Sequence, residues 1–170
     1  MIFKGVAHRY GDDIDTDVIL PGPYMNLSEP MDLARHALEG LDPGFAARVR
    51  PGDLLVVGRN FGCGSSREHS PIALKAAGLS CVVARSFARI FYRNAINIGL
   101  AVVIAPEAVA HIIGGMELIV DTEAGIITAE DCQYAIQPVP AFIKRLMDNG
   151  GLDSFVRERL AERARWKVSS

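Results

Sequence analysis

The sequence predicts an α/β protein with a mixed sheet and flanking helices. Short apolar runs are each followed by a glycine-rich or polar loop and then by a helical pattern. This order is typical of parallel strands joined by right-handed crossovers. Residues 117–138 instead read as antiparallel strands that turn at residues 123–125, and residues 140–166 as two helices split at the glycine pair 150–151. Since 170 residues is an ordinary size for one domain, we expect a single domain over residues 1–170.

Four strands are expected in the first two thirds of the chain. They are the opening run and three continuous apolar runs typical of buried strands, at residues 1–9, 53–58, 79–84 and 100–105. Three helices are predicted near them, at residues 31–40, 70–78 and 86–99. Gly40 and Gly78 are expected to end the first two helices, and Ser86 to cap the start of the third. Residues 10–26 are rich in turn-forming side chains, so we expect a loop there.

Composition and charge exclude several classes of protein. Hydrophobic residues make up 49% and charged residues 22% of the chain, which is the composition of a folded protein. The formal net charge of −2 gives no reason to expect nucleic acid as a partner. The first residues lack the pattern of a signal peptide, and no apolar run approaches membrane-spanning length. We therefore expect a cytoplasmic protein that binds neither nucleic acid nor membranes.

The three cysteines, Cys63, Cys81 and Cys132, are scattered along the chain. Their odd number and wide spacing do not form a disulfide framework and fit a reducing compartment. The sequence contains no C-x-x-C pair and no two histidines at the spacing of metal ligands. We expect this chain to hold no metal by itself.

The stretch NFGCGSSREHS, residues 60–70, concentrates the polar chemistry of the chain. It lies between a predicted buried strand and a helix, where parallel sheets collect ligands. Gly62 and Gly64 permit positive φ and a close approach to the backbone amides, and Arg67 suits a carboxylate or phosphate. The pattern therefore predicts an anion site with two hydroxyls. The alternative is that Ser65 and Ser66 only cap a helix and that Arg67 makes a surface ion pair.

Known motifs of similar composition do not match this loop. A P-loop fails at Cys63, a dinucleotide fingerprint begun at Gly62 fails at Arg67, and an esterase nucleophile elbow fails at Glu68. Two other clusters stand out, namely the acidic GDDIDTD at residues 11–17 and three arginines at four-residue intervals, Arg85, Arg89 and Arg93. The acidic cluster lacks the spacing of an EF-hand. The arginine stripe predicts either a solvated face, a wall of an acidic ligand's pocket or a partner interface.

Three segments together resemble one family. They are GDDIDTDVILPGPY, GRNFGCGSSREHSPIALKAAG and ARSFARIFYRNAINIGL, which cover most of residues 5–105. In this order they resemble the small subunits of 3-isopropylmalate dehydratase and of homoaconitase. The resemblance implies the swivelling β/β/α domain that forms the C-terminal part of aconitase, here as a separate chain.

The resemblance also implies a hydro-lyase of two chains. In this family a large subunit holds a [4Fe–4S] cluster through three cysteines, and the small subunit closes over the site. Carried over by position, Ser65 matches the base that removes the carbon-bound proton and Arg67 the arginine that binds a substrate carboxylate. Ser66 matches a hydroxyl in contact with the substrate, and Asp17 an active-site aspartate. Since serine is a weak base, Arg67 and backbone amides of the glycine turn must stabilise its alkoxide.

The residues after PGPY bear on the choice of substrate. In the homoaconitase type an arginine follows the tyrosine by two positions and meets an extra carboxylate; in the isopropylmalate type an apolar residue meets the isopropyl group. This chain has Met25 and then Asn26. Asparagine carries no charge, so a small dicarboxylate, 2-isopropylmalate, is favoured over a tricarboxylate, with a dimethylmalate as a further alternative. A non-catalytic anion-binding module and an isolated hydrolase using Ser65 are the alternatives from other classes.

Overall fold

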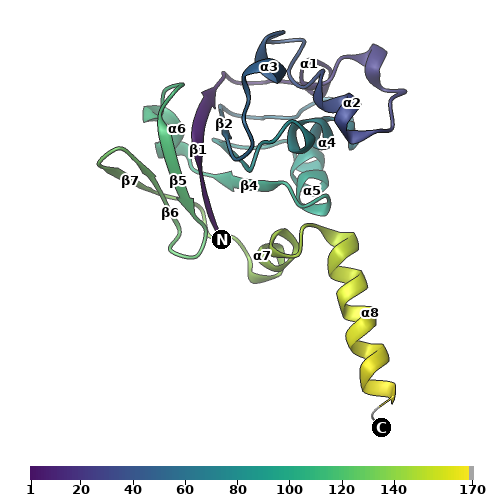
Figure 1. Cartoon of the computed structure of the whole chain (residues 1–170). Coiled ribbons are helices and arrows are strands. Elements are labelled where there is room, and N and C mark those ends of the chain that lie inside the picture. Colours follow the sequence, from purple (N-terminus) through teal and green to yellow (C-terminus); the bar gives the residue numbers. More distant parts are fainter. Residues whose placement is uncertain (169–170) are drawn as a thin grey trace.

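The computed structural model describes residues 1–168 and contains one seven-stranded sheet (Figure 1). Its strands lie in the order β4-β3-β2-β1-β5-β6-β7. The strands are β1 (Ile2–Arg9), β2 (Leu54–Val57), β3 (Cys81–Ala84), β4 (Ala101–Ile104), β5 (Glu117–Asp121), β6 (Ile126–Ala129) and β7 (Cys132–Ala135). The sheet is mixed, as predicted, because its two halves pair in different directions.

Strands β1 to β4 form the parallel half of the sheet. β2 pairs with β1 and β3, and β3 pairs with β4, all in parallel. Every residue of β2 and β3 is buried, which explains their continuous apolar runs. All carboxyl ends of these strands therefore lie at the same edge of the sheet.

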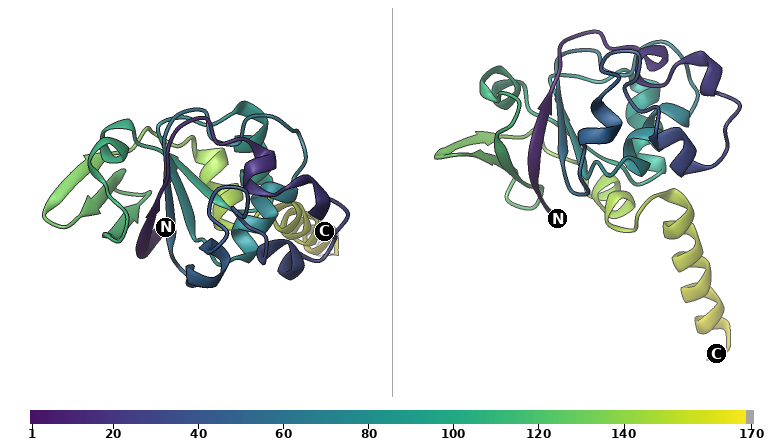
Figure 2. Two further views of the ribbon diagram at one scale, coloured as in Figure 1. Left: turned by 90° about the horizontal axis from the view of Figure 1, so that it is seen from above. Right: turned by 45° about the horizontal axis from the view of Figure 1, so that its top comes forward.

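Strands β5 to β7 form an antiparallel extension beside β1, as predicted from residues 117–138. In β5 buried and exposed residues alternate, with Leu118 and Val120 buried and Glu117 and Ile119 exposed. One face of this half therefore packs on the core and the other faces solvent. In Figure 2 the extension projects to one side of the parallel half.

Helices cover both faces of the parallel half (Figure 2). One face carries α4 (His69–Ala76) and α5 (Arg89–Asn97), together with the short elements α1 (Thr16–Ile19), η1 (Gly22–Tyr24), α2 (Pro30–Ala34) and α3 (Phe45–Arg48). The other face carries α6 (Pro106–His111). Helix α7 (Ala141–Asp148) contributes Leu146 to the first core and Met147 to the second. Helix α8 (Leu152–Val168) extends away from the sheet (Figure 1).

Alternate residues of the central strands divide the interior into two cores. Leu55 and Val57 of β2 pack under α4 and α5, whereas Leu54 and Val56 face α6. The first core holds the largest buried rings, Phe45, Phe61 and Phe91. The period-two pattern of each strand thus sorts its side chains between the two layers.

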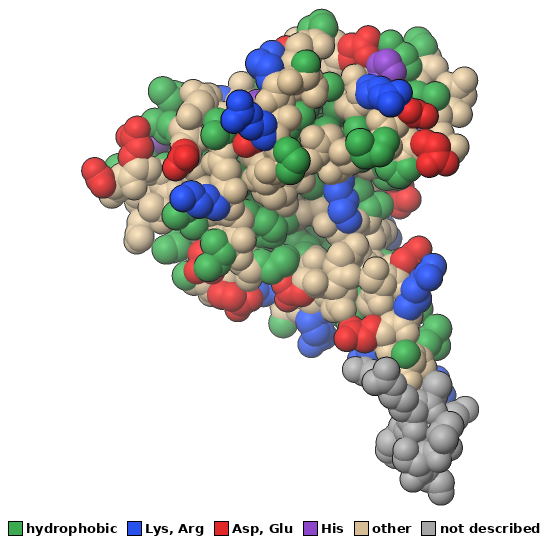
Figure 3. Space-filling model, viewed as in Figure 1, with side chains coloured by type: hydrophobic (Ala, Val, Ile, Leu, Met, Phe, Trp, Pro, Cys, Tyr) green, Lys and Arg blue, Asp and Glu red, His purple; other side chains and the backbone are tan. Residues whose placement is uncertain are grey.

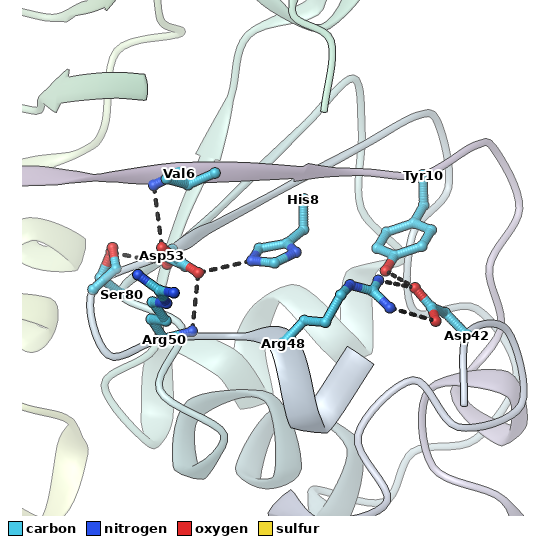
Figure 4. Close-up of polar contacts among 9 residues, drawn as sticks. Val6, His8, Tyr10, Asp42, Arg48, Arg50, Asp53 and Ser80 are labelled. Carbon is cyan, nitrogen blue, oxygen red and sulfur yellow. Dashed lines mark hydrogen bonds and ion pairs between the residues drawn. The ribbon is translucent and has the colours of Figure 1, made fainter. Parts of the chain in front are cut away.

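A buried carboxylate joins β1 to the turn before β2 (Figure 4). Asp53 is only 6% exposed and accepts hydrogen bonds from His8 Nε2 at 2.8 Å, Arg50 N at 2.9 Å and Val6 N at 3.2 Å. Burial raises the pKa of Asp53, but these donors outweigh it and leave the pKa below its ordinary value. The backbone carbonyl of Asp53 in turn accepts from Ser80, so one residue joins three segments.

A second polar group lies beside it in Figure 4. The Tyr10 hydroxyl donates to Asp42 Oδ2 at 2.6 Å, and Arg48 pairs with the same carboxylate. These two donors lower the pKa of Asp42 to about 2, and Arg48 has the larger effect. This group fastens the end of β1 to the segment that contains α3.

Several elements differ from the prediction. The expected loop at residues 10–26 contains α1 and η1, and the helix expected at residues 31–40 is regular only over Pro30–Ala34. Helix α5 begins at Arg89, so Ser86 as its cap is wrong: the residue before the helix is Ala88. The Ser86 hydroxyl instead accepts a hydrogen bond from Asn60 N at 2.9 Å. The end of α4 before Gly78, with φ +107, and the split at Gly150–Gly151 are confirmed.

The surface mixes both signs of charge. On the face viewed in Figure 3, acidic and basic side chains are interspersed over the sheet and helices. No helix among the described residues has the length and apolar character needed to cross a bilayer.

Candidate active site

The loop at residues 60–68 leaves the carboxyl end of β2 and leads into α4. It is hydrogen-bonded along its length to the acidic segment at residues 11–17. Gly62 N donates to Ile14 O at 2.8 Å, and Thr16 N donates to Cys63 O at 2.8 Å. The two segments singled out in the sequence therefore form one site, although nearly fifty residues separate them.

Thr16 is the residue that fixes the position of Ser65. It is 1% exposed, and its Oγ1 accepts a hydrogen bond from Ser65 N at 2.8 Å. Its carbonyl accepts from Ser70 Oγ at 3.1 Å. The sequence interpretation missed Thr16. The available signal was its place between Asp15 and Asp17, since Asp15 caps α1 and thereby orients the threonine inward.

Arg67 is folded back onto Ser65. Its Nε donates to Ser65 Oγ at 2.8 Å, and its backbone N donates to the same oxygen at 3.2 Å. Two donors on one hydroxyl oxygen favour the charged form of that oxygen, one of them a guanidinium. The alternative of a helix cap and a surface ion pair does not describe this geometry. Glu68 occupies the cap position of α4, and Arg67 makes no ion pair within residues 1–168.

The two glycines of the loop have different roles. Gly62 and Gly64 have φ values of +78° and +102°, as predicted. A Cβ on Gly62 would lie 2.2 Å from the Phe91 ring, so this glycine lets the loop pack on α5. The expectation that Gly62 offers its amide to a ligand is wrong, because that N–H donates to Ile14 O. The Gly64 N–H makes no hydrogen bond within residues 1–168 and lies at the exposed part of the loop.

A cavity of about 590 Å³ opens beside Ser65. The loop and the first turn of α5 form its walls; the lining residues are Asn60, Gly62, Cys63, Gly64, Ser65, Ala88, Arg89, Ile90 and Arg93. Two arginines of the predicted stripe thus lie at the site. Arg85, by contrast, precedes the helix and does not line the cavity.

The other predicted site residues do not line this cavity. Ser66 is exposed, and its carbonyl accepts a hydrogen bond from Asn94 Nδ2 at 2.9 Å. Asp17 is exposed in the first turn of α1, next to Thr16. Met25 packs partly against the core, and Asn26 is exposed just after η1. The structure therefore brings Ser65, Arg67 and the glycines together and leaves Asp17, Met25 and Asn26 outside the cavity.

The cysteines do not form a metal centre. Cys63 lies half-buried in the loop, Cys81 is buried in β3, and Cys132 is exposed in β7. Among the described residues no three His, Cys, Asp or Glu side chains come close enough to hold a metal ion. Burial, with Asp15 and Asp13 nearby, raises the pKa of the Cys63 thiol. Its thiolate is therefore disfavoured at neutral pH. The donor set does not fit an iron–sulfur cluster held by this chain alone.

Comparison with known proteins decides the family. The model of the aconitase C-terminal domain matches residues 33–107, which include the Ser65 loop. The 3-isopropylmalate dehydratase small subunit of Caldicellulosiruptor saccharolyticus is 56% identical over 166 residues, covering 96% of both chains. The chain belongs to the family of 3-isopropylmalate dehydratase small subunits.

Two further members of this family are informative. The 2,3-dimethylmalate dehydratase small subunit of Eubacterium barkeri is 51% identical over 155 residues, covering 90% of this chain and 95% of that one. The crystal structure of 3-isopropylmalate dehydratase from Methanocaldococcus jannaschii has a TM-score of 0.93 and 41% identity, and the match covers 97% of this chain and 99% of that one. The α/β fold expected from the resemblance to the aconitase swivelling domain is confirmed.

Proposed function

We propose that this chain is the small subunit of a two-chain hydro-lyase that interconverts 2-isopropylmalate and 3-isopropylmalate, the isomerisation step of leucine biosynthesis. The observation that carries the proposal is the Ser65 hydroxyl, which accepts hydrogen bonds from both Arg67 Nε and Arg67 N beside an open cavity. The curated relatives that support it are dehydratase small subunits matched over nearly their full length. The cysteine usage supports a role in the cytoplasm.

Ser65 acts as the base in this proposal. The substrate's C–H bond breaks, its electrons form the new C=C bond as hydroxide leaves the neighbouring carbon, and Ser65 Oγ takes the proton. Addition of water in the opposite sense returns a proton from Ser65 and moves the hydroxyl group. The positive guanidinium of Arg67 stabilises the alkoxide form of Ser65 before proton transfer, and it can bind a substrate carboxylate once the ligand enters. Ser66 and Asp17 complete the substrate contacts of this chain.

The partner is a large subunit that supplies the rest of the site. The resemblance to the family supports a [4Fe–4S] cluster on that subunit, where an open iron would act as Lewis acid on the leaving hydroxyl. This chain contributes the proton-accepting side of the site. The exposure of Ser66, Arg67 and Asp17 supports the proposal, because these side chains are accessible to a second chain.

The segment that contains half-buried Met25 and exposed Asn26 selects the substrate in this proposal. A neutral side chain at residue 26 suits a substrate with two carboxylates and an aliphatic branch. Asn26→Arg should raise the kcat/KM for homocitrate relative to 2-isopropylmalate by about tenfold, since a charged hydrogen bond contributes about 1.5–3 kcal/mol. The ratio is measured with both substrates on the assembled enzyme. Asn26→Gln, which adds no charge, is the control, and an equal ratio in all three proteins would mean that residue 26 does not contact the variable group.

The proposal is tested by anaerobic assembly with the large subunit from the same organism. The complex is offered 2-isopropylmalate, 2,3-dimethylmalate and homocitrate, and the unsaturated intermediate is followed by its ultraviolet absorbance. Highest kcat/KM for 2-isopropylmalate is expected. Preference for 2,3-dimethylmalate would support the second candidate, which the 51% identity to the Eubacterium barkeri subunit favours. Turnover of none of these substrates would contradict both.

A further inference from the structure

Helix α5 presents two unpaired arginines on either side of an exposed isoleucine. Arg89 and Arg93 are one helical turn apart and both exposed, and Ile90 is 48% exposed. Neither arginine makes a hydrogen bond or an ion pair through its side chain within residues 1–168. By contrast, Arg48 and Arg59 both pair with aspartates. We call Arg89, Ile90 and Arg93 the α5 patch.

The α5 patch is held rigidly beside the Ser65 loop. The opposite face of α5 is buried through Phe91, Ala95 and Ile96, and Phe91 packs on Gly62. All three residues of the patch line the same cavity as Ser65. The patch is therefore continuous with the surface around Ser65. In the proposed function a second chain completes the site at that surface.

From this arrangement we infer that the α5 patch is a docking surface for the large subunit, which contacts it through carboxylates set around an apolar residue. The inference rests on the proposed function for the presence of that subunit. Arginine and large apolar side chains are enriched where interfaces bind most strongly. Carboxylates of the partner would give Arg89 and Arg93 the pairs that they lack in this chain, and an apolar residue of the partner would cover Ile90.

The charges favour a protein partner over the substrate at this patch. A malate homologue carries two carboxylates, and Arg67 already stands at Ser65 for one of them. Arg89 and Arg93 are exposed and lack the bracing hydrogen bonds that preorganise a substrate-binding side chain. Exposed arginine side chains without such hydrogen bonds suit an interface in which binding of the second chain orders them.

The test measures the affinity of the chain for the large subunit by titration calorimetry under anaerobic conditions. The variants are Arg89→Glu, Arg93→Glu, the double variant and Ile90→Ser. The double variant should raise the Kd by roughly 30-fold or more, and the difference should shrink at 0.5 M salt. Arg145→Glu on α7, an exposed arginine with the same change in charge, is the control and should change the Kd by about twofold or less.

Folding and catalysis are measured in separate experiments. Glutamate at residue 89 stands in the first turn of α5, where a negative charge is favourable, so the variants should keep the wild-type circular dichroism. If a variant misfolds, Arg89→Gln with Arg93→Gln replaces it. The KM of the double variant for 2-isopropylmalate is measured at saturating large subunit, so that a loss of docking is distinguished from a loss of substrate binding.

Three outcomes would overturn the inference. An unchanged Kd with a raised KM would assign the arginines to substrate binding, and an unchanged Kd and KM would leave them without either role. Failure of the wild-type chain to bind the large subunit would overturn both the inference and the proposed function. If the wild-type complex forms but turns over no malate homologue, only the proposed function fails, and the Kd values still decide the docking surface.

Discussion

Arg67 changes the chemistry available to Ser65. A serine hydroxyl in water is a very weak base, and two donated hydrogen bonds lower the free energy of its alkoxide. The distances of 2.8 Å from Nε and 3.2 Å from the backbone N place both donors on the same oxygen. The positive charge of the guanidinium therefore lies directly beside the oxygen that is proposed to accept the proton.

Asp53 makes a pH-dependent contribution to the stability of the fold. Its pKa is lowered in the folded protein, so its contribution is present above the unfolded value near 4 and is lost as the pH falls through the lower folded value. Asp53→Asn should reduce the free energy of unfolding by about 1–3 kcal/mol at pH 7, because an amide cannot accept all three hydrogen bonds. The deficit should shrink below about pH 4.

Urea unfolding at several pH values between 3 and 7 measures this difference. Asp131→Asn, at an exposed turn position, is the control and should stay within about 0.5 kcal/mol of the wild type. A deficit of the same size at pH 3 and pH 7 would show that the charge of Asp53 contributes nothing.

At the scale of elements, the contact between the Ser65 loop and α5 depends on the absence of a side chain at residue 62. Gly62→Ala should destabilise the fold by about 3 kcal/mol or more, since the added methyl group meets the Phe91 ring and φ is positive. Gly125 has a similar φ of +75° but nothing within 4 Å of an added Cβ. Gly125→Ala therefore measures the backbone cost alone, about 1–2 kcal/mol.

Chemical unfolding of Gly62→Ala and Gly125→Ala measures the difference between their free energies of unfolding. Equal destabilisation by the two substitutions would mean that the loop moves away from Phe91 without cost. A larger loss for Gly62→Ala, together with a loss of turnover, is expected because the same loop carries Ser65.

The elements that the sequence predicts correctly have either a strong hydrophobic pattern or a glycine that ends a helix. Strands β2 to β4 lie in continuous apolar runs bounded by polar residues, glycine or proline, and α4 and α7 end just before glycines with positive φ. Helices α1, α3 and α6 are four to six residues long, too short to show an apolar period, so the sequence pattern does not predict them. Helix α5 begins later than predicted because the Ser86 hydroxyl accepts a hydrogen bond from Asn60 N and does not cap the helix.

In the candidate site too, the sequence predicts only the features that have a local pattern. The composition of the loop at residues 60–70 predicts an anion site, because glycine permits positive φ, serine supplies a hydroxyl and arginine supplies a positive charge. The Ser65–Thr16 hydrogen bond joins residues 49 positions apart, and the packing of Gly62 on Phe91 depends on the tertiary fold. The Asp15 cap indicates that Thr16 points inward, but no local pattern identifies the distant partner in either contact, so neither contact could be read from the sequence.

At the scale of the whole molecule, the parallel half of the sheet places the site and the rest of the chain lies away from it. The Ser65 loop, the acidic segment and the start of α5 meet at the carboxyl edge of β2 and β3. The antiparallel extension and α8 project elsewhere (Figures 1 and 2). This division suits a chain that offers one edge to a partner holding the remaining catalytic groups.

The most direct test of the account is the turnover of 2-isopropylmalate by the assembled enzyme with Ser65→Ala in this chain. Loss of the general base should lower kcat by roughly 10²- to 10⁴-fold, while the Kd for the large subunit stays at the wild-type value. Ser154→Ala on α8 is the control and should keep full activity. A Ser65→Ala enzyme that turns over within a few-fold of the wild type would contradict the assignment of Ser65 as the base.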